Sequence, residues 1–300
     1  MSAAAYRGWG LVFALVGVLS FSIRPILIKL SYAASPITPN TLLFLRMALS
    51  APFFFAIAWW LRKQEPRLTR RDWAAVIGLG FIGYYAASFL DFVGLQFVGA
   101  GVGRLILFLY PTIVLVLSFF FLHKHPTRVQ ITALVASYAG IALVVSDQIG
   151  VSGAGRLFLL GVLLCFASGL CYAIYLVAGS QVVKRIGSMR FTAYSTLVAS
   201  AFAVLQFLAL EPAGALDLPA NVWSYAILIA TVATVLPLFL QAEALKRIGA
   251  SDFALVGAAS PVSVVTLSAI GLGEPFGWRQ FAGAALVIFG VLLVSLRKGN

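Results

Sequence analysis

Three polar side chains at helical spacing give the first sign of a binding surface. Tyr84, Ser88 and Asp91 are separated by four and three positions, so on a helix they share one face. A tyrosine offers an apolar ring and one hydroxyl, which suits an amphipathic solute whose polar end must be oriented. The spacing predicts the wall of a solute pathway, although each tyrosine alone is equally well explained by helix packing with its hydroxyl satisfied.

Further hydroxyl-bearing side chains are expected at a similar depth in other segments. None of them is charged, and the prediction rests on the cluster rather than on any single member. The predicted substrate-binding residues are Tyr84, Tyr85, Ser88, Tyr110, Ser168, Tyr172, Tyr175, Thr234, Ser260 and Ser263.

Four charged side chains inside apolar stretches form a second group, namely Arg24, Arg46, Asp91 and Arg104. Counting along each stretch places them in its extracytoplasmic part, so we expect them at the outer mouth of the pathway. A buried arginine is costly unless it is paired or hydrated, and Asp91 is the expected partner of one or more of them. Such a mouth would be net positive and would attract a solute carboxylate. Extension of the arginines to the lipid headgroups, strongest for Arg104, is the alternative.

Signals of catalysis and of cofactor binding are weak. His123 and His125 are the only histidines, and no cysteine or carboxylate cluster accompanies them, so a metal site is not expected. Gly99, Gly101 and Gly103 have the spacing of a dinucleotide loop, but no predicted strand precedes them. The sequence holds no Ser-His-Asp, paired-carboxylate or HExxH arrangement. We therefore expect neither an enzyme nor a cofactor.

The elements that must position these side chains are membrane-spanning helices. Hydrophobic residues make up 62% of the 300 and charged residues only 10%, against about 25% charged in a soluble domain. The apolar runs approach the roughly 20 residues that one membrane crossing needs, and they are continuous rather than alternating, which favours helices over barrel strands. The ten predicted spans are 9–31, 40–61, 73–95, 101–122, 129–146, 157–180, 190–209, 222–245, 250–271 and 279–296.

The placement of the basic residues predicts the topology. Most of the 21 Lys and Arg residues fall at one side of the predicted spans, whereas only Lys29, Arg104, Arg156 and Arg279 fall at the other. Because cytoplasmic loops carry the excess of positive charge, both termini are expected in the cytoplasm. The net charge of +12 is spread along the chain rather than gathered on one face, so nucleic acid is not an expected partner.

The chain also contains an internal repeat. An offset of 150 residues places Gly99 on Gly249, Pro111 on Pro261 and Gly140 on Gly290 without a gap. The predicted units are residues 1–150 and 151–300, with five helices each. Because five is odd, the second unit must enter the membrane in the opposite orientation, and inverted repeats of this kind are typical of transporters.

Two matched prolines predict breaks within the membrane. Pro111 and Pro261 fall near the middle of their spans, where each removes a backbone hydrogen bond. Freed backbone groups are tolerated at that depth only where protein or a water-filled cavity satisfies them. The pair therefore predicts a central cavity, with a simple packing kink as the alternative.

The whole chain resembles the drug/metabolite transporter superfamily, and in particular its EamA-type ten-helix members. The first half departs from the repeat pattern, because His123-Lys124-His125-Pro126 stands where the second half has Gly-Glu-Pro. The resemblance rests on the five-plus-five repeat, Arg46, Gly249-Ala250-Ser251, Pro261, the Gly-Glu-Pro at Gly273 to Pro275, and the spacing of Gly283 and Gly290.

This resemblance implies an alternating-access carrier in the bacterial inner membrane. Within the superfamily the chain looks most like exporters of aromatic amino acids, so the implied cargo is an amino acid or a related small metabolite, moved by a monomer in the lipid bilayer. Carriers of sugars, drugs or nucleotide-like metabolites, a channel, and a membrane enzyme are the alternatives. Since no carboxylate is expected at the centre, exchange or uniport is favoured over proton antiport.

Overall fold

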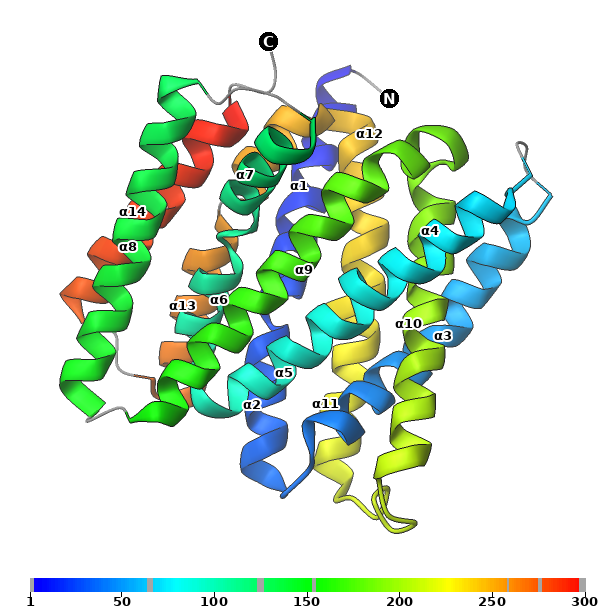
Figure 1. Ribbon diagram of the computed structural model, residues 1–300, viewed down its shortest axis with the longest axis horizontal. Coiled ribbons are helices and arrows are strands. Elements are labelled where there is room, and N and C mark those ends of the chain that lie inside the picture. The colour runs from blue at the N-terminus through cyan, green and yellow to red at the C-terminus, as the bar shows by residue number, and fades with distance from the viewer. Residues whose placement is uncertain are drawn as a thin grey trace.

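The computed structural model describes residues 3–63, 67–122, 127–152, 155–257, 259–274 and 277–296, and these are almost entirely helical (Figure 1). The α-helices are α1 (Ala3–Ser22), α2 (Arg24–Ala34), α3 (Pro39–Leu61), α4 (Arg70–Gly80), α5 (Ala87–Phe97), α6 (Ala100–Leu107), α7 (Tyr110–Leu122), α8 (Arg128–Ser152), α9 (Arg156–Ile186), α10 (Ser188–Leu210), α11 (Ala220–Ala230), α12 (Leu236–Gly257), α13 (Ala259–Leu272) and α14 (Trp278–Leu296). Two π-helical segments, η1 (Phe81–Ala86) and η2 (Thr231–Val235), join α4 to α5 and α11 to α12.

Many of these helices are long and apolar enough to cross a bilayer. Among the described residues eight stretches meet that requirement, and Ser260–Leu272 is a shorter apolar helix. Large hydrophobic side chains such as Trp60, Leu208 and Ile270 are exposed on the outside of the bundle, as expected where lipid rather than water is the solvent. The chain is therefore a multi-pass membrane protein.

The predicted boundary between residues 245 and 250 is wrong. The sequence interpretation ended one span at residue 245 and began the next at 250, whereas α12 continues to Gly257 and α13 begins at Ala259. Glycine is tolerated inside a membrane helix because neighbouring helices support it, so Gly249 does not end α12. The interruption instead comes shortly before Pro261, whose ring disfavours helix in the residues that precede it.

Several helices are irregular, and most irregularities recur 150 residues apart. The segments η1 and η2 begin at residues 81 and 231. α6 ends at Leu107 and α12 at Gly257, and in each case a proline follows within the first turn of the next helix. A further break without such a counterpart separates α1 from α2 at Ile23, where Pro25 lies in the first turn of α2.

The long helices pack mainly across the two halves of the chain. α1 packs along α12, α5 along α9, α3 along α10 and α8 along α14. The α8–α14 contact is very close, because a Cβ atom added to Gly140 would lie 2.5 Å from the backbone oxygen of Gly283. Small residues allow such close approach of two helix backbones in membranes.

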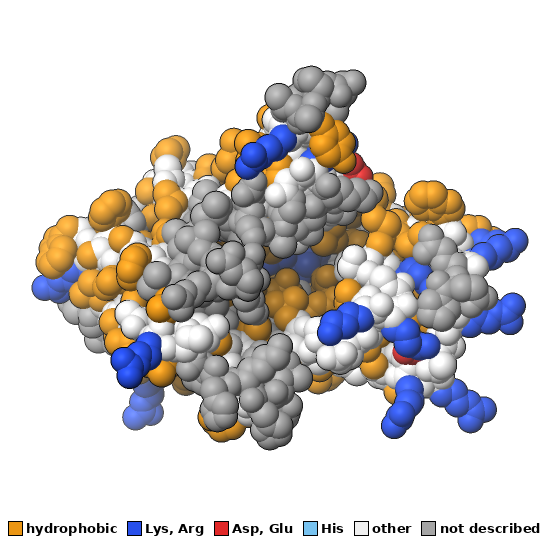
Figure 2. All heavy atoms as spheres, turned by 90° about the horizontal axis from the view of Figure 1, so that it is seen from above, with side chains coloured by type: hydrophobic (Ala, Val, Ile, Leu, Met, Phe, Trp, Pro, Cys, Tyr) orange, Lys and Arg blue, Asp and Glu red, His pale blue; other side chains and the backbone are white. Residues whose placement is uncertain are grey.

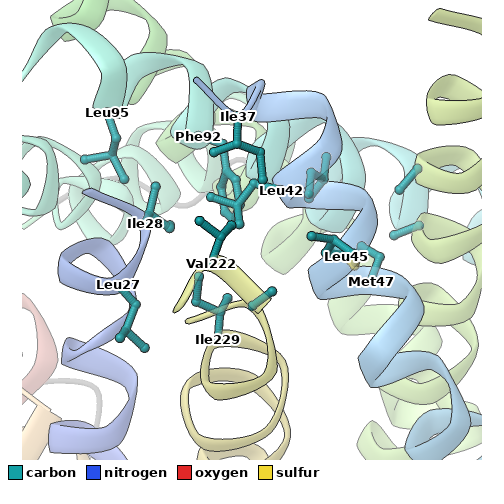
Figure 3. Packing of buried hydrophobic residues seen from close by; sticks show 14 residues of the cluster. Leu27, Ile28, Ile37, Leu42, Leu45, Met47, Phe92, Leu95, Val222 and Ile229 are labelled. Carbon is teal, nitrogen blue, oxygen red and sulfur yellow. The ribbon is translucent and has the colours of Figure 1, made fainter. Parts of the chain in front are cut away.

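One end of the bundle is closed by a packed hydrophobic cluster. Residues of α2, α3, α5 and α11 point toward one another there (Figure 3), among them Ile28, Leu42, Phe92 and Val222, all at most 1% exposed. Side chains buried this completely leave no space among them for water or a solute. This end is opposite to the face on which both termini lie (Figure 1).

Two glutamates of the second half also tie the halves together. Glu274 accepts hydrogen bonds from the backbone nitrogens of Ala100 and Gly101, at 2.7 and 3.2 Å, and so occupies the N-terminus of α6. Glu211 accepts hydrogen bonds from the side chains of Thr38 and Asn40 at the start of α3. A carboxylate at a helix N-terminus is stabilised by the free N–H groups and by the helix dipole.

Candidate functional site

A cavity of about 240 Å³ lies between the two halves. Its wall is built from α1, the start of α2, α3, η1 and α5, α6 and the start of α7, α9, η2, α12 and α13. Viewed from the face that carries the termini, the molecule has a central hollow with basic and hydrophobic side chains inside it (Figure 2). The cavity thus faces the side opposite to the packed cluster of Figure 3.

The two π-helical segments present polar side chains to this cavity. Tyr84 lies in η1, Ser88 and Asp91 follow it in α5, and Thr234 lies in η2. All four line the cavity. A π-helical turn leaves backbone groups unevenly paired, and the Thr234 hydroxyl compensates by donating to the carbonyl of Ile229 at 2.8 Å.

Arg46 connects these two segments. Its Nη1 donates to Ser88 Oγ at 2.8 Å and its Nε donates to Thr234 Oγ1 at 3.2 Å. The side chain is only 3% exposed, and its guanidinium carbon lies 5.8 Å from the centre of the Phe92 ring. Arg46 of α3 therefore holds one hydroxyl from each half of the chain.

Arg24 and Arg104 form a second basic group around Phe21. Each guanidinium carbon lies 4.4 Å from the centre of the Phe21 ring. Arg104 Nη2 donates to Ser260 Oγ at 3.0 Å, and Ser260 Oγ is 3.1 Å from Ser22 Oγ. Cation–π contact of this kind is favourable by about 0.5–2 kcal/mol.

Aromatic rings form the apolar part of the wall. Tyr110 and Tyr172 meet edge to face with ring centres 5.1 Å apart, and Phe108 packs edge to face on Tyr110. Tyr84 packs in the same manner on Tyr175. A wall that combines rings, hydroxyls and charges can hold a solute that has both an apolar and an ionic part.

The structure brings most of the predicted binding residues together. Those that line the cavity are Tyr84, Ser88, Tyr110, Ser168, Tyr172, Thr234 and Ser260. Tyr85, Tyr175 and Ser263 are not part of the wall. Tyr85 instead donates a hydrogen bond to Gln206 Oε1 at 2.6 Å, and Tyr175 stacks on Phe191 behind Tyr84. Pro111 and Pro261 also lie outside the wall, while neighbouring Tyr110 and Ser260 belong to it.

The four charged residues differ from the sequence interpretation in two ways. Arg24, Arg46, Asp91 and Arg104 line the same cavity as the uncharged set, rather than a separate outer mouth. Within the described part of the chain, Asp91 makes no ion pair within 4.0 Å with any of the arginines. Counting residues along a span assumes straight helices of equal depth, whereas the break at Ile23 and the turn η1 change where Arg24 and Asp91 point.

The position of Asp91 also removes one argument about coupling. Exchange or uniport was favoured because no carboxylate was expected at the centre of the protein. Asp91 is 7% exposed and lines the cavity itself. A titratable group is therefore present where a solute would bind, and proton coupling is not disfavoured on that ground.

Several wall residues were missed by sequence reasoning, although the internal repeat could have identified one polar member. Gln241 is 150 positions after Asp91, and both line the cavity. Phe21, Phe108 and Pro237 also belong to the wall. Their apolar side chains carry no signal in a sequence that is hydrophobic throughout. No group of three or more metal-ligating side chains occurs among the described residues, and His123 and His125 lie outside them.

Comparison with known proteins gives relatives along the whole chain. The uncharacterized transporter YcbK of Bacillus subtilis is 29% identical, over 96% of this chain and 93% of the relative. The uncharacterized transporter sll1319 of Synechocystis is 24% identical, over 96% and 94%. A crystal structure with 17% sequence identity has a TM-score of 0.65 and matches 97% of this chain and 99% of that one, which shows that the fold is shared.

A family model excludes the membrane enzyme that the sequence left open as an alternative. The EamA-like transporter family matches the chain twice, over residues 8–146 and 159–296. The two matches cover most of the chain, including every element that lines the cavity. The chain therefore belongs to the EamA-like transporter family, and it is a membrane transporter rather than an enzyme.

Proposed function

We propose that this transporter is an alternating-access carrier that exports amino acids, aromatic ones in particular, and related small metabolites. The observation that carries the proposal is the composition of the cavity, in which arginines, one aspartate and several aromatic rings face one space. An amino-acid zwitterion offers a carboxylate for an arginine and an ammonium for Asp91. The side chain of phenylalanine or tyrosine would lie against the rings of Tyr110 and Tyr172.

The size of the cavity favours a small cargo. Drug-sized ligands occupy pockets of about 300–1,000 Å³, and this cavity is smaller, at about 240 Å³. An amino acid fits a cavity of this volume better than a nucleotide-like metabolite does. Sugars are a weaker alternative, because a neutral sugar would leave the guanidinium charges without a counter-charge.

The arrangement of the halves supports an inverted repeat of five helices each, with ten helices in total. Exchange of the two halves turns the α1–α12 contact into the α9–α5 contact, and both contacts are present. Contacts that map onto themselves under the same exchange join α3 to α10 and α8 to α14. Two units related in this way can rock against each other around a fixed central site.

The two ends of the cavity favour a carrier over a channel. The packed cluster that includes Ile28 and Phe92 closes one end, while the hollow opens on the face that carries the termini. If the bacterial inner membrane holds the chain with both termini in the cytoplasm, as the basic residues predict, the cavity faces the cytoplasm. That state would load cargo for export.

Counterflow in proteoliposomes tests the proposal. Vesicles loaded with unlabelled phenylalanine should transiently accumulate labelled phenylalanine, and tyrosine and tryptophan should compete better than sugars or cationic drugs. An open channel gives no such accumulation. If competent, folded protein shows no accumulation of any amino acid, the assignment of the cargo is wrong and the other solutes become the candidates.

A further inference from the structure

The three arginines of the cavity differ in how well their hydrogen-bond donors are satisfied. Arg46 donates to Ser88 and Thr234. Among the described residues, by contrast, the buried Nε atoms of Arg24 and Arg104 have no acceptor. A buried donor without an acceptor costs about 1–3 kcal/mol, and more when the group is charged.

The contact with Phe21 does not use the hydrogen-bond donors of either guanidinium. A guanidinium over a ring face interacts through its π-system, while its N–H groups point outward in its own plane. Both guanidinium carbons lie 4.4 Å from the same ring centre, so the two carbons are at most twice that distance apart. An oxyanion has two or more oxygens and can accept hydrogen bonds from both arginines over such a span.

The charge balance of the cavity points to the same kind of ligand. Among the described wall residues, three arginines face a single carboxylate, that of Asp91. Asp91 makes no ion pair within 4.0 Å in the described part of the chain. Arg104 is only 8% exposed, and a guanidinium kept from bulk water needs an opposite charge nearby.

We propose that Arg24 and Arg104, arranged around Phe21, form an oxyanion-binding subsite that accepts a carboxylate or an inorganic oxyanion of similar size. Arg46 is a positioning residue that orients Ser88 and Thr234, and the anion binds to the other two arginines. If the bound carboxylate is that of the exported solute, the inference rests on the proposed function. A free anion has the same chemistry and would bind without the solute.

The subsite is tested by binding measurements on purified protein in nanodiscs. The probes are phenylalanine, 3-phenylpropionate, which lacks the amine, phenethylamine, which lacks the carboxylate, and acetate and sulfate as free oxyanions. The variants are Arg104→Gln, Arg24→Gln and Arg104→Lys. Arg128 is exposed, and Arg128→Gln is the matched control.

We expect Arg104→Gln and Arg24→Gln to weaken the binding of every oxyanion probe that binds the unaltered protein by about ten- to a hundredfold. Arg104→Lys should weaken it less, and Arg128→Gln should leave it unchanged.

The outcomes separate the two sources of the anion. Competition between acetate or sulfate and phenylalanine places the solute carboxylate in the subsite, whereas enhancement shows that a free anion binds beside the solute; either supports the subsite. If acetate or sulfate binds through these arginines but phenylalanine neither binds nor exchanges, the subsite stands and the amino-acid assignment fails. If folded Arg104→Gln and Arg24→Gln proteins bind every oxyanion probe as the unaltered protein does, the subsite is disproved, even where phenylalanine counterflow persists.

Discussion

The two halves of the chain contribute unequally to a cavity that they frame in the same way. At the 150-residue offset, Tyr84 corresponds to Thr234, Asp91 to Gln241 and Tyr110 to Ser260, and all six line the cavity. The π-helical segments η1 and η2 and the interruptions before Pro111 and Pro261 also correspond. The two halves therefore share the backbone features that expose polar groups in a membrane.

The charges have not been kept in both halves. Arg46 corresponds to Thr196, Asp91 to Gln241 and Arg104 to Ala254. Among the wall residues that the structure describes, the ionic ones therefore come from the first half. Two halves that exchange roles during alternating access need a similar framework, whereas a single solute needs only one set of charges. If the chain is the proposed alternating-access carrier, its shared backbone irregularities serve movement and the side chains of one half serve recognition.

Replacing Arg46 by the residue of the other half should have the largest effect. Arg46→Thr removes the donors that hold Ser88 and Thr234 at 2.8 and 3.2 Å. Each charge-assisted hydrogen bond contributes about 1.5–3 kcal/mol, so we expect the initial rate of phenylalanine counterflow to fall about a hundredfold. Arg46→Lys keeps the charge, so the counterflow rate should fall less than in Arg46→Thr. A rate near that of the unaltered protein in folded Arg46→Thr would show that the two hydroxyls need no fixed partner.

Asp91→Gln makes the first half match the second at a position that faces the cavity. Without the carboxylate a zwitterion loses the partner of its ammonium, whereas 3-phenylpropionate has no ammonium to lose. We expect phenylalanine binding to weaken about tenfold, which corresponds to about 1.4 kcal/mol, and 3-phenylpropionate binding to stay equal or improve. Competition binding with both solutes measures the ratio of the affinity for phenylalanine to the affinity for 3-phenylpropionate.

The reciprocal change sharpens this test. Gln241→Asp in the Asp91→Gln background moves the carboxylate to the equivalent wall position of the second half. If the cavity is pseudosymmetric, part of the phenylalanine affinity should return. Equal loss for both solutes in Asp91→Gln would contradict a role for Asp91 in recognising the amine.

Sequence patterns gave most of the architecture and seven of the ten uncharged residues proposed for the cavity wall. Hydropathy identifies helices because a bilayer imposes their length and composition, and aligned Pro111 and Pro261 locate the interrupted ones. The depth of the charged side chains in the membrane could not be counted correctly from the sequence. The π-helical segment η1 adds residues to a turn, and the break at Ile23 redirects Arg24. Apolar wall residues such as Phe21 could not be predicted from the sequence, since only tertiary packing distinguishes them from residues that face lipid.

Gly83→Ala should disturb the shared framework without touching a charge. A Cβ atom at position 83 would lie 2.3 Å from Tyr175 Cβ, so η1 could not approach α9 as closely as it does. Overpacking of this kind costs about 1–3 kcal/mol, and a displaced Tyr175 would also move Tyr84, which packs on it. We expect a lower melting temperature and a severalfold slower counterflow. Gly78→Ala, where an added Cβ meets nothing within 4 Å, is the matched control.

Glu274 marks the last difference between the halves and the smallest expected effect. Its carboxylate accepts hydrogen bonds from two backbone nitrogens at the start of α6, across the boundary between the halves. The corresponding position in the first half holds Lys124, which lies outside the described residues. Glu274→Gln keeps one acceptor oxygen but loses the charge that the helix N-terminus favours, so we expect a loss of about 1 kcal/mol in stability. Thermal unfolding in detergent measures this loss of stability, and Glu274→Ala should lose more stability than Glu274→Gln.

Because this contact lies away from the cavity wall, the affinity for phenylalanine should stay the same. A change in affinity as large as that of Asp91→Gln would mean that the contact also sets which state of the carrier is populated.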